Sequence, residues 1–333
     1  MTCLQKTQPF LLLIAIGLGL GLAQVSWLSE LAAGLIVPLL ALMLYATFLP
    51  VTWGSFRQTF AKTKVVLTSL AINFLWTPIL AWTLGALFLR ESVDVWVGLL
   101  MLMVTPCTDW YLVFTGVAGG DVALATALLP VNLTLQVLLL PVYLLIFAGM
   151  VVEVDPLNWA QGLFFSLGIP LILARISQET IIQLWGEASL DQVSQKIGVV
   201  QLISLNLAVV CIFAAKGHML GGHLGLWLQL LAPVSLFFLI NLLLAYQAAQ
   251  LFRLSYPEFA CLSCTTLARN SPLSLAIAAT VFPDRPLITL TLVIGPLIEL
   301  PVLTLLSQLL LQIKNQPRIW SAAPHTTAPP DQD

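Results

Sequence analysis

Charge is what this sequence has least of. Only 8% of its 333 residues are Asp, Glu, Lys or Arg, whereas a soluble protein carries about 25%. So few charged side chains cannot cover a surface that faces water, which excludes a soluble globule. Apolar residues make up 59% of the chain, and the mean hydropathy is +0.98. Because a helix crosses a bilayer with about 20 apolar residues, the composition predicts a polytopic membrane protein.

Other deficits exclude several functions. The net charge is −2 and no long basic run occurs, which argues against nucleic acid as a partner. The three histidines fall in a predicted outer loop and in the C-terminal tail, so we expect no metal site in the membrane, no cofactor and no enzyme. A GxxxxGK[ST] motif is also missing. Energy for any transport must therefore come from an ion gradient rather than from ATP bound by this chain.

Ten apolar runs are separated by polar residues, Pro or Gly. Their approximate ranges are 9–25, 31–50, 65–89, 95–118, 122–148, 158–175, 197–216, 224–252, 257–281 and 286–313. The predicted fold class is an all-α polytopic membrane protein with ten transmembrane helices. Residues 317–333 are rich in Pro, Thr, Ala and Asp, and we expect them to form a disordered tail.

The basic residues give an independent test of this count. With ten spans, nine of the thirteen Lys and Arg residues lie on the side of the two termini, and three lie on the other. The remaining one, Arg269, falls within a span. Since cytoplasmic loops carry an excess of Lys and Arg, both termini are predicted to be cytoplasmic, in a plasma membrane of the bacterial type.

The two halves of the chain look like copies of each other. An offset of 163 residues places Gln136 on Glu299 and Thr108 on Ser271. Each copy holds five spans, an odd number, so the second copy must be inverted relative to the first. The two repeats are predicted to occupy residues 1–150 and 151–316. Inverted repeats are typical of secondary transporters, whose substrate sites lie near the midplane where broken helices meet.

Three ionisable residues lie near the middle of predicted spans: Asp109, Arg269 and Glu299. A lone charge there costs about 2.5–3.5 kcal/mol even on the lenient insertion scale. A static ion pair could account for Asp109 and Arg269, but it leaves Glu299 without a partner and ready to bind a proton. We therefore assign coupling or gating to Asp109, Arg269, Glu299 and the aligned Gln136.

Polar residues beside the predicted breaks complete the candidate site. Pro106 and Pro272 free backbone groups that a cavity or a neighbour must satisfy. Asn132 and Gln136 are four residues apart and share one helix face, although they could equally be interhelical hydrogen-bonding residues. The candidate substrate-binding residues are Cys107, Thr108, Asn132, Asn270 and Ser271. Cys261 and Cys264 are interpreted as packing residues.

Several motifs resemble those of the arsenite permeases, the arsenical-resistance family within the bile acid/sodium symporter superfamily. They are Pro106-Cys107-Thr108, Gly120-Asp121, the run 129–137 and the run 294–302, which reads IGPLIELPV. The resemblance implies a five-plus-five inverted repeat in which spans 4 and 9 cross where they unwind. It also implies that the span-4 cysteine and the span-10 glutamate are functional, and these match Cys107 and Glu299.

The chain departs from its relatives at two places. Arsenite permeases have apolar residues after the Cys-containing tripeptide, where this chain has Asp109-Trp110. Sodium-coupled relatives carry a Glu four residues before a Gln-Asn pair, at positions that here read Thr265, Arg269 and Asn270. An arginine at that place suggests that sodium is not used there and that the fixed charge substitutes for the cation.

The sequence therefore predicts a secondary transporter. The main hypothesis is proton-coupled efflux of arsenite or antimonite, with protons, a metalloid and the lipid bilayer as partners. The alternative is transport of a small organic anion with Arg269 as its counter-charge, because arginine binds carboxylates in a bidentate way.

Overall fold

The computed structural model describes residues 8–50, 62–107, 110–147, 149, 161–162, 164–216 and 224–314. Within these ranges the regular structure is helical and includes no strand. Six of the described helical segments are long and apolar enough to cross a membrane: Trp27–Phe48, Thr63–Phe88, Val122–Phe147, Lys196–Ala215, Leu228–Phe252 and Pro286–Lys314. The chain is thus an all-helical, multi-pass membrane protein.

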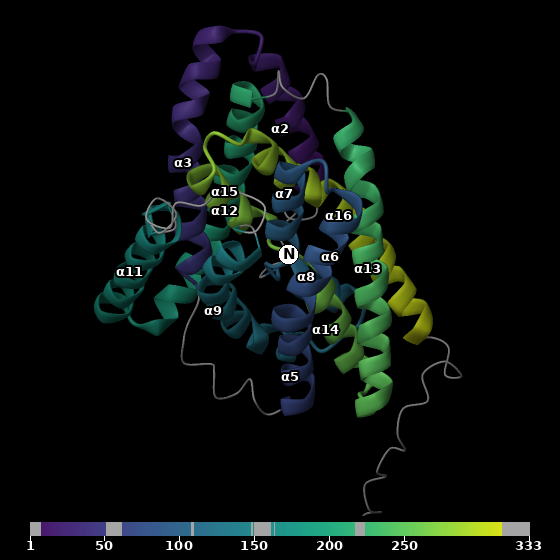
Figure 1. Ribbon diagram of the computed structural model, residues 1–333. Helices are drawn as coiled ribbons and strands as arrows, with labels where there is room; N and C mark the ends of the chain where they lie inside the picture. The colour runs from purple at the N-terminus through teal and green to yellow at the C-terminus, as the bar shows by residue number, and fades with distance from the viewer. Residues whose placement is uncertain are drawn as a thin grey trace, which may run out of the picture.

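Four helices form a first bundle (Figure 1). They are α2 (Gln8–Leu22), α3 (Ser26–Phe48), α11 (Ile169–Trp185) and α12 (Glu187–Lys216). Gly19 allows α2 to lie against α12, because a Cβ at this position would be 2.6 Å from the Val210 carbonyl oxygen. The outward side chains of α3 and α11 are mostly large and apolar, as expected for helices that face lipid.

Most of the other described helices form a second bundle. Its continuous members are the segment α5–η3–α6 (Thr63–Ala71, Ile72–Trp76 and Thr77–Phe88), α9 (Val122–Phe147), α13 (Leu224–Phe252) and α16 (Pro286–Lys314). The middle part of the first segment, η3, is a π-helical turn that contains the buried Asn73. Turns of this kind are frequent at functional sites.

Two apolar segments of the second bundle are interrupted. The first is divided into α7 (Val93–Met103) and α8 (Trp110–Val117), and the second into α14 (Tyr256–Leu267) and α15 (Ser271–Val281). The unwound stretches meet in an antiparallel bridge between Pro106 and Arg269. The Cys107 N–H donates to the Ala268 carbonyl oxygen at 3.0 Å, and the Asn270 N–H donates to that of Thr105 at 2.7 Å. These bonds satisfy backbone groups that the breaks would otherwise leave unpaired.

Two predicted boundaries were wrong. Helix continues through η5 (Phe164–Gly168) and α11 to Trp185, not to residue 175, and α12 begins at Glu187 rather than near residue 197. The polar residues that suggested a loop are paired within the helix, since Arg175 bonds to Gln178 and Glu179. Gly186, at φ +80°, ends α11 instead. The predicted tail, 317–333, lies outside the described residues.

Candidate functional site

The side chain of Arg269 is buried beside the crossing of the two unwound stretches. Its guanidinium donates to four neutral acceptors: the carbonyl oxygens of Met103 (2.9 Å), Leu267 (3.3 Å) and Thr266, and the Asn73 Oδ1 (3.0 Å). It also lies 5.1 Å from the centroid of the Phe237 ring. Three of the acceptors are carbonyls at the C-terminal ends of α7 and α14, where helices carry partial negative charge. The guanidinium therefore acts as a fixed cation between two helix ends.

Glu299 has a partner, and the prediction that it lacks one was wrong. The backbone N–H of Arg269 donates to its Oε1 at 2.7 Å, and only 3% of the residue is exposed. The unwound backbone supplies this donor, because Arg269 lies between α14 and α15 and its N–H is free of helical bonding. Glu299 thus connects α16 to the crossing through the main chain.

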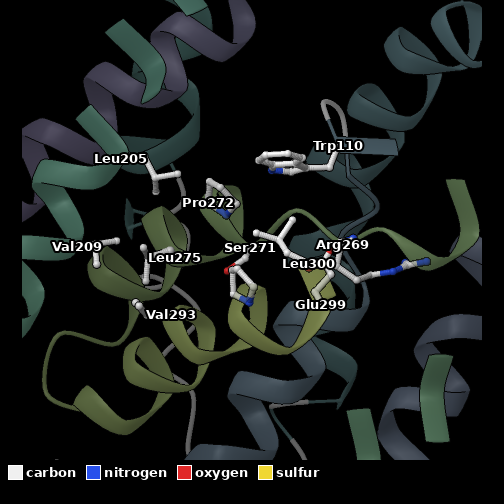
Figure 2. Close-up of a pocket in the computed structure, with 11 residues that line it drawn as sticks. Trp110, Leu205, Val209, Arg269, Ser271, Pro272, Leu275, Val293, Glu299 and Leu300 are labelled. Atoms are coloured by element: carbon white, nitrogen blue, oxygen red, sulfur yellow. Dashed lines mark hydrogen bonds between the residues drawn. The ribbon is translucent and has the colours of Figure 1, made fainter. Parts of the chain in front are cut away.

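A pocket next to this contact lies between parts of the two bundles (Figure 2). Leu205 and Val209 of α12 face Leu275 of α15, and Glu299 lines the pocket from α16. The remaining lining residues are Trp110, Arg269, Ser271, Pro272, Val293, Pro296 and Leu300. The space measures about 450 Å³, including its open mouth. Its walls are mainly apolar, and the Arg269 guanidinium extends away from Leu205 and Val209.

Cys107 lies in the crossing itself. It is 4% exposed, and its Sγ accepts a hydrogen bond of 3.2 Å from the Trp110 N–H. The thiol therefore lies at the beginning of α8, next to a residue that lines the pocket. Thr108 and Asp109, which separate the two, lie outside the described residues, so the predicted pairing of Asp109 with Arg269 remains a prediction.

The other predicted substrate contacts of the second half also have structural partners. The Asn270 Oδ1 accepts from the Leu273 N–H at 3.2 Å and caps α15, as is common for Asn at this position. The Ser271 hydroxyl donates to the Leu292 carbonyl oxygen. Both residues thus hold α15 in place, and Ser271 additionally lines the pocket.

Asn132 and Gln136 lie on α9 and are fully buried. The Asn132 Nδ2 donates to the Thr265 Oγ1 at 3.2 Å, which ties α9 to the last turn of α14. Within the described residues, the Asn132 Oδ1 and both polar atoms of the Gln136 side chain have no hydrogen-bond partner. A buried polar group in that situation costs about 1–3 kcal/mol. Interhelical hydrogen bonding therefore accounts for the Asn132 nitrogen but not for the other three polar atoms of the pair.

Sequence reasoning missed two residues of the site, Asn73 and Phe237. Asn73 is a polar residue in the middle of an apolar span, a signal that was present in the sequence. Phe237 gave no signal, because it is one of many apolar residues in α13. Among the described residues, no group of three or more His, Cys, Asp or Glu side chains could hold a metal ion.

Residues 37–223 match the model of the Sodium Bile acid symporter family, which is more than half of the chain. The protein belongs to the sodium bile acid symporter family. Membership in this family makes it a multi-pass membrane transporter and not an enzyme. It is 25% identical to the arsenical-resistance protein Acr3 of Corynebacterium glutamicum, over 97% of this chain and 94% of that protein.

A second Acr3 protein, from Alkaliphilus metalliredigens, is 24% identical over 85% of this chain and 81% of its own length. The uncharacterized protein YbaS of Bacillus subtilis is 24% identical over 41% of this chain and 44% of its own. The resemblance to arsenical-resistance proteins indicated by the motifs is thereby confirmed.

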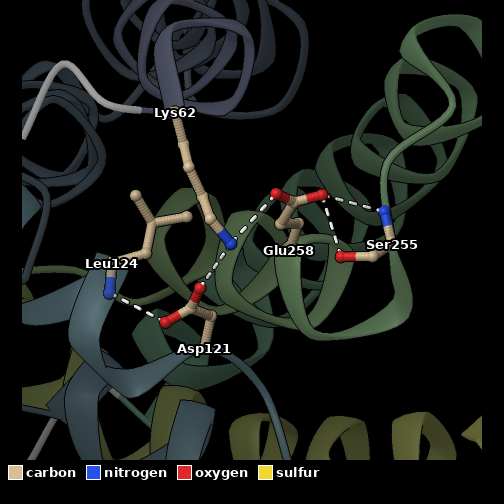
Figure 3. A network of polar contacts seen from close by, with 5 residues as sticks. All are labelled: Lys62, Asp121, Leu124, Ser255 and Glu258. Carbon is tan, nitrogen blue, oxygen red and sulfur yellow. Dashed lines mark hydrogen bonds and ion pairs between the residues drawn. The ribbon is translucent and has the colours of Figure 1, made fainter. Parts of the chain in front are cut away.

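This symporter-family chain also has an ionic network at the opposite end of α14 from the crossing (Figure 3). The Lys62 Nζ lies 2.8 Å from the Asp121 Oδ2 and 3.1 Å from the Glu258 Oε1. Asp121 also accepts from the Leu124 N–H at 2.9 Å, and Glu258 accepts from Ser255 in a capping box. Lys62 thus joins the beginnings of α5, α9 and α14.

The network shifts the pKa values of its members. The hydrogen bond to Asp121 raises the pKa of Lys62 above its ordinary 10.5, against an opposing effect of burial. Burial by itself would raise the pKa of Asp121, but the bonds from Lys62 and Leu124 outweigh it and hold that pKa below 3.8. The stabilisation by Asp121 is present above pH 3.8 and is lost as the pH falls through the lower folded pKa of Asp121. The stabilisation by Lys62 is complete below pH 10.5 and is lost as the pH rises through the higher folded pKa of Lys62.

Lys62→Met should lower the thermal unfolding temperature of the detergent-solubilised protein by about 2 °C at pH 7. The effect is small because Lys62 is 43% exposed, and an exposed ion pair contributes about 0.2–1 kcal/mol. The difference from wild type should shrink as pH falls below 3.8 and through the lower folded pKa of Asp121, because the carboxylate that pairs with Lys62 is then protonated. Lys64→Met, two residues away and exposed, is the control. An equal loss in both variants would contradict a role for the network.

Proposed function

We propose that this protein exports arsenite and antimonite from the cytoplasm in exchange for protons. The observation that carries the proposal is the convergence of a thiol and a carboxylate at one crossing. Cys107 lies in the first unwound stretch, and Glu299 is bonded to the second. Trivalent arsenic and antimony are soft centres that favour thiolate ligands, and a carboxylate in the membrane interior is a proton carrier. The similarity to two Acr3 proteins supports the same substrate class.

We further propose that ten segments cross the membrane as a five-plus-five inverted repeat. The offset of 163 residues supports this, since it maps α7, α8 and α9 onto α14, α15 and α16. The same offset carries Cys107 to Asn270 and Thr105 to Ala268, so it converts one backbone bond of the crossing into the other. With the termini in the cytoplasm, as the basic residues favour, the Lys62 network lies on the cytoplasmic side. The ion pair between Arg285 and Asp94, at 2.8 Å, then lies on the outer side.

Glu299 is the proposed coupling residue. Its carboxylate receives the Arg269 N–H, and it also lines the pocket between the bundles. Protonation would weaken its bond to the crossing, because a neutral carboxyl oxygen is a poorer acceptor than a charged one. Proton binding would thereby loosen the segment beside the substrate. Sodium is not required in this mechanism, since the Arg269 guanidinium already supplies a positive charge to the two helix ends.

The organic-anion alternative is less well supported. A bidentate contact with a carboxylate needs two parallel N–H groups of one guanidinium. Three nitrogen atoms of Arg269 already donate to protein acceptors, and the group extends away from the first bundle. Exchange of these contacts for a substrate carboxylate would leave buried carbonyl oxygens without donors, at about 1–3 kcal/mol each.

Everted membrane vesicles that contain the protein provide the test. Arsenite should accumulate in energised vesicles, stop accumulating when a protonophore removes the proton gradient, and be unaffected when choline replaces sodium. Vesicles without the protein are the control, and bile-acid uptake should equal that control. Accumulation that requires sodium, or that continues without a proton gradient, would refute proton coupling. No arsenite accumulation at all would refute the substrate.

A further inference from the structure

The unpartnered atoms on α9 form a small group with mixed hydrogen-bonding character. The Asn132 Oδ1 and Gln136 Oε1 are acceptors, and the Gln136 Nε2 is a donor. The two residues are one helical turn apart and fully buried. Asn132 uses its Nδ2 in the bond to the Thr265 hydroxyl, and its oxygen is the atom left over. Such atoms are normally satisfied in a native protein, and an exception calls for a ligand or another explanation.

The proposed inverted repeat accounts for the missing partner of Gln136. Its counterpart is Glu299, which accepts the backbone N–H of Arg269. The same offset makes Pro106 the counterpart of Arg269, and proline has no N–H to donate. If the correspondence holds for side chains as well, Gln136 is expected next to Pro106 and Cys107, as Glu299 lies next to Arg269. The first half of the site therefore presents an unused amide where the second half has a completed bond.

The chemistry of these atoms selects a class of ligand. A metal cation would be held by oxygen atoms alone, and the Nε2 donor of Gln136 would oppose it. An anion would need donors, whereas two of the three atoms are acceptors. A neutral solute with several hydroxyl groups both donates and accepts hydrogen bonds and so matches the set.

We propose that Asn132 and Gln136 form a hydroxyl-recognition subsite beside Cys107 that binds a small neutral polyhydroxide. This inference rests on the proposed function, under which the ligand is the uncharged trihydroxide of arsenic or antimony. Cys107 recognises the central atom, and the two amides recognise its hydroxyl groups. Selectivity then depends on both, because a thiol alone does not distinguish a trihydroxide from other thiophilic species.

A stabilised but less selective variant is the expected signature. Gln136→Met keeps the length of the side chain and removes both unpartnered polar atoms. It should raise the unfolding temperature of the substrate-free protein, because no buried polar group remains unsatisfied at this position. It should also raise the KM for arsenite about tenfold, because the loss of one hydrogen bond to the substrate weakens binding by about that factor. The kcat should change little. A purely structural role for Gln136 predicts the opposite shift in unfolding temperature.

Asn206→Leu is the matched control. Asn206 also has an unpartnered buried oxygen, but its Nδ2 bonds only to Leu202 within α12. Its replacement should leave the KM unchanged, whatever it does to stability. A lower unfolding temperature for Gln136→Met, or an unchanged KM, would overturn the subsite. So would stabilisation of the wild type by sodium that is lost in Gln136→Met, which would indicate a cation site instead.

A second probe separates the subsite from the proposed substrate. Boric acid is a neutral trihydroxide that does not bind sulfur, so it tests the hydroxyl contacts without the thiol. It should raise the unfolding temperature of the wild type and of Cys107→Ser, but not that of Gln136→Met. If the wild type fails to transport arsenite but shows this pattern, the proposed function fails and the subsite stands. If boric acid has no effect on the wild type, the subsite fails even where arsenite is transported.

Discussion

Cys107→Ser is expected to abolish arsenite export. The variant keeps an oxygen that can accept the hydrogen bond from the Trp110 N–H, and the Cys107 N–H still bonds to Ala268. The crossing should therefore fold as in the wild type, and only the affinity for a thiophilic centre is lost. Arsenite accumulation in everted vesicles should fall to the level of vesicles without the protein. Resistance of an arsenite-sensitive host should be lost with it, while the amount of protein in the membrane is unchanged.

The remaining thiols of the second bundle supply the control. Cys261 and Cys264 are fully buried in α14, and we interpret them as packing residues. Cys261→Ala and Cys264→Ala should each keep most of the export activity, since they remove a thiol without touching the crossing. Full activity in Cys107→Ser would remove thiol binding from the mechanism. Loss of transport in either control, at normal protein amounts, would show that more than one thiol is needed.

Glu299→Gln should stop proton-driven export but preserve substrate exchange. The glutamine oxygen can still accept the Arg269 N–H that now bonds to Glu299, so the contact between α16 and the crossing is kept. The side chain can no longer gain or lose a proton. Net accumulation of arsenite against a gradient should fall to background, whereas vesicles preloaded with arsenite should still exchange it for labelled arsenite outside.

Two further variants are compared with Glu299→Gln. Glu299→Leu removes the acceptor as well as the proton site, leaving the Arg269 N–H buried and unpaired, and it should lower both exchange and the unfolding temperature. Glu258→Gln removes an acid from the ionic network of Figure 3 and should leave pumping unaffected. If Glu299→Gln accumulates arsenite normally, with an unchanged pH dependence, Glu299 is structural and the coupling residue lies elsewhere.

The sequence predicted the helical segments and both interruptions because these depend on local patterns. Apolar runs define the helices, and the polar residues near Pro106 and Pro272 mark the unwound stretches. The surroundings of Arg269 could not be predicted in the same way. Its acceptors come from three separate segments, α5–η3–α6, α7 and α14, and no pattern within one segment reveals such a meeting point.

The partner of Glu299 was missed for a related reason. Sequence reasoning compared side chains with side chains, whereas the actual donor is a main-chain N–H that exists only because the helix is interrupted at Arg269. The length of α11 was underestimated because Arg175 and Glu179 neutralise each other across one helical turn. Their effect on helix formation is therefore smaller than their charge suggests.

The π-helical turn η3 has a geometric consequence for the span that contains it. Such a turn accommodates one residue more than a regular helix does, and each residue of an α-helix advances the side chains by about 100° around the axis. The extra residue changes the direction in which side chains within and beyond the turn point around the helix axis. Both contacts of this segment come from the turn itself: Asn73 meets Arg269, and the Trp76 Nε1 donates to the Asn241 Oδ1 on α13 at 3.1 Å. Deletion of a single residue here should return the turn to α-helical geometry and turn one of these two side chains away from its partner.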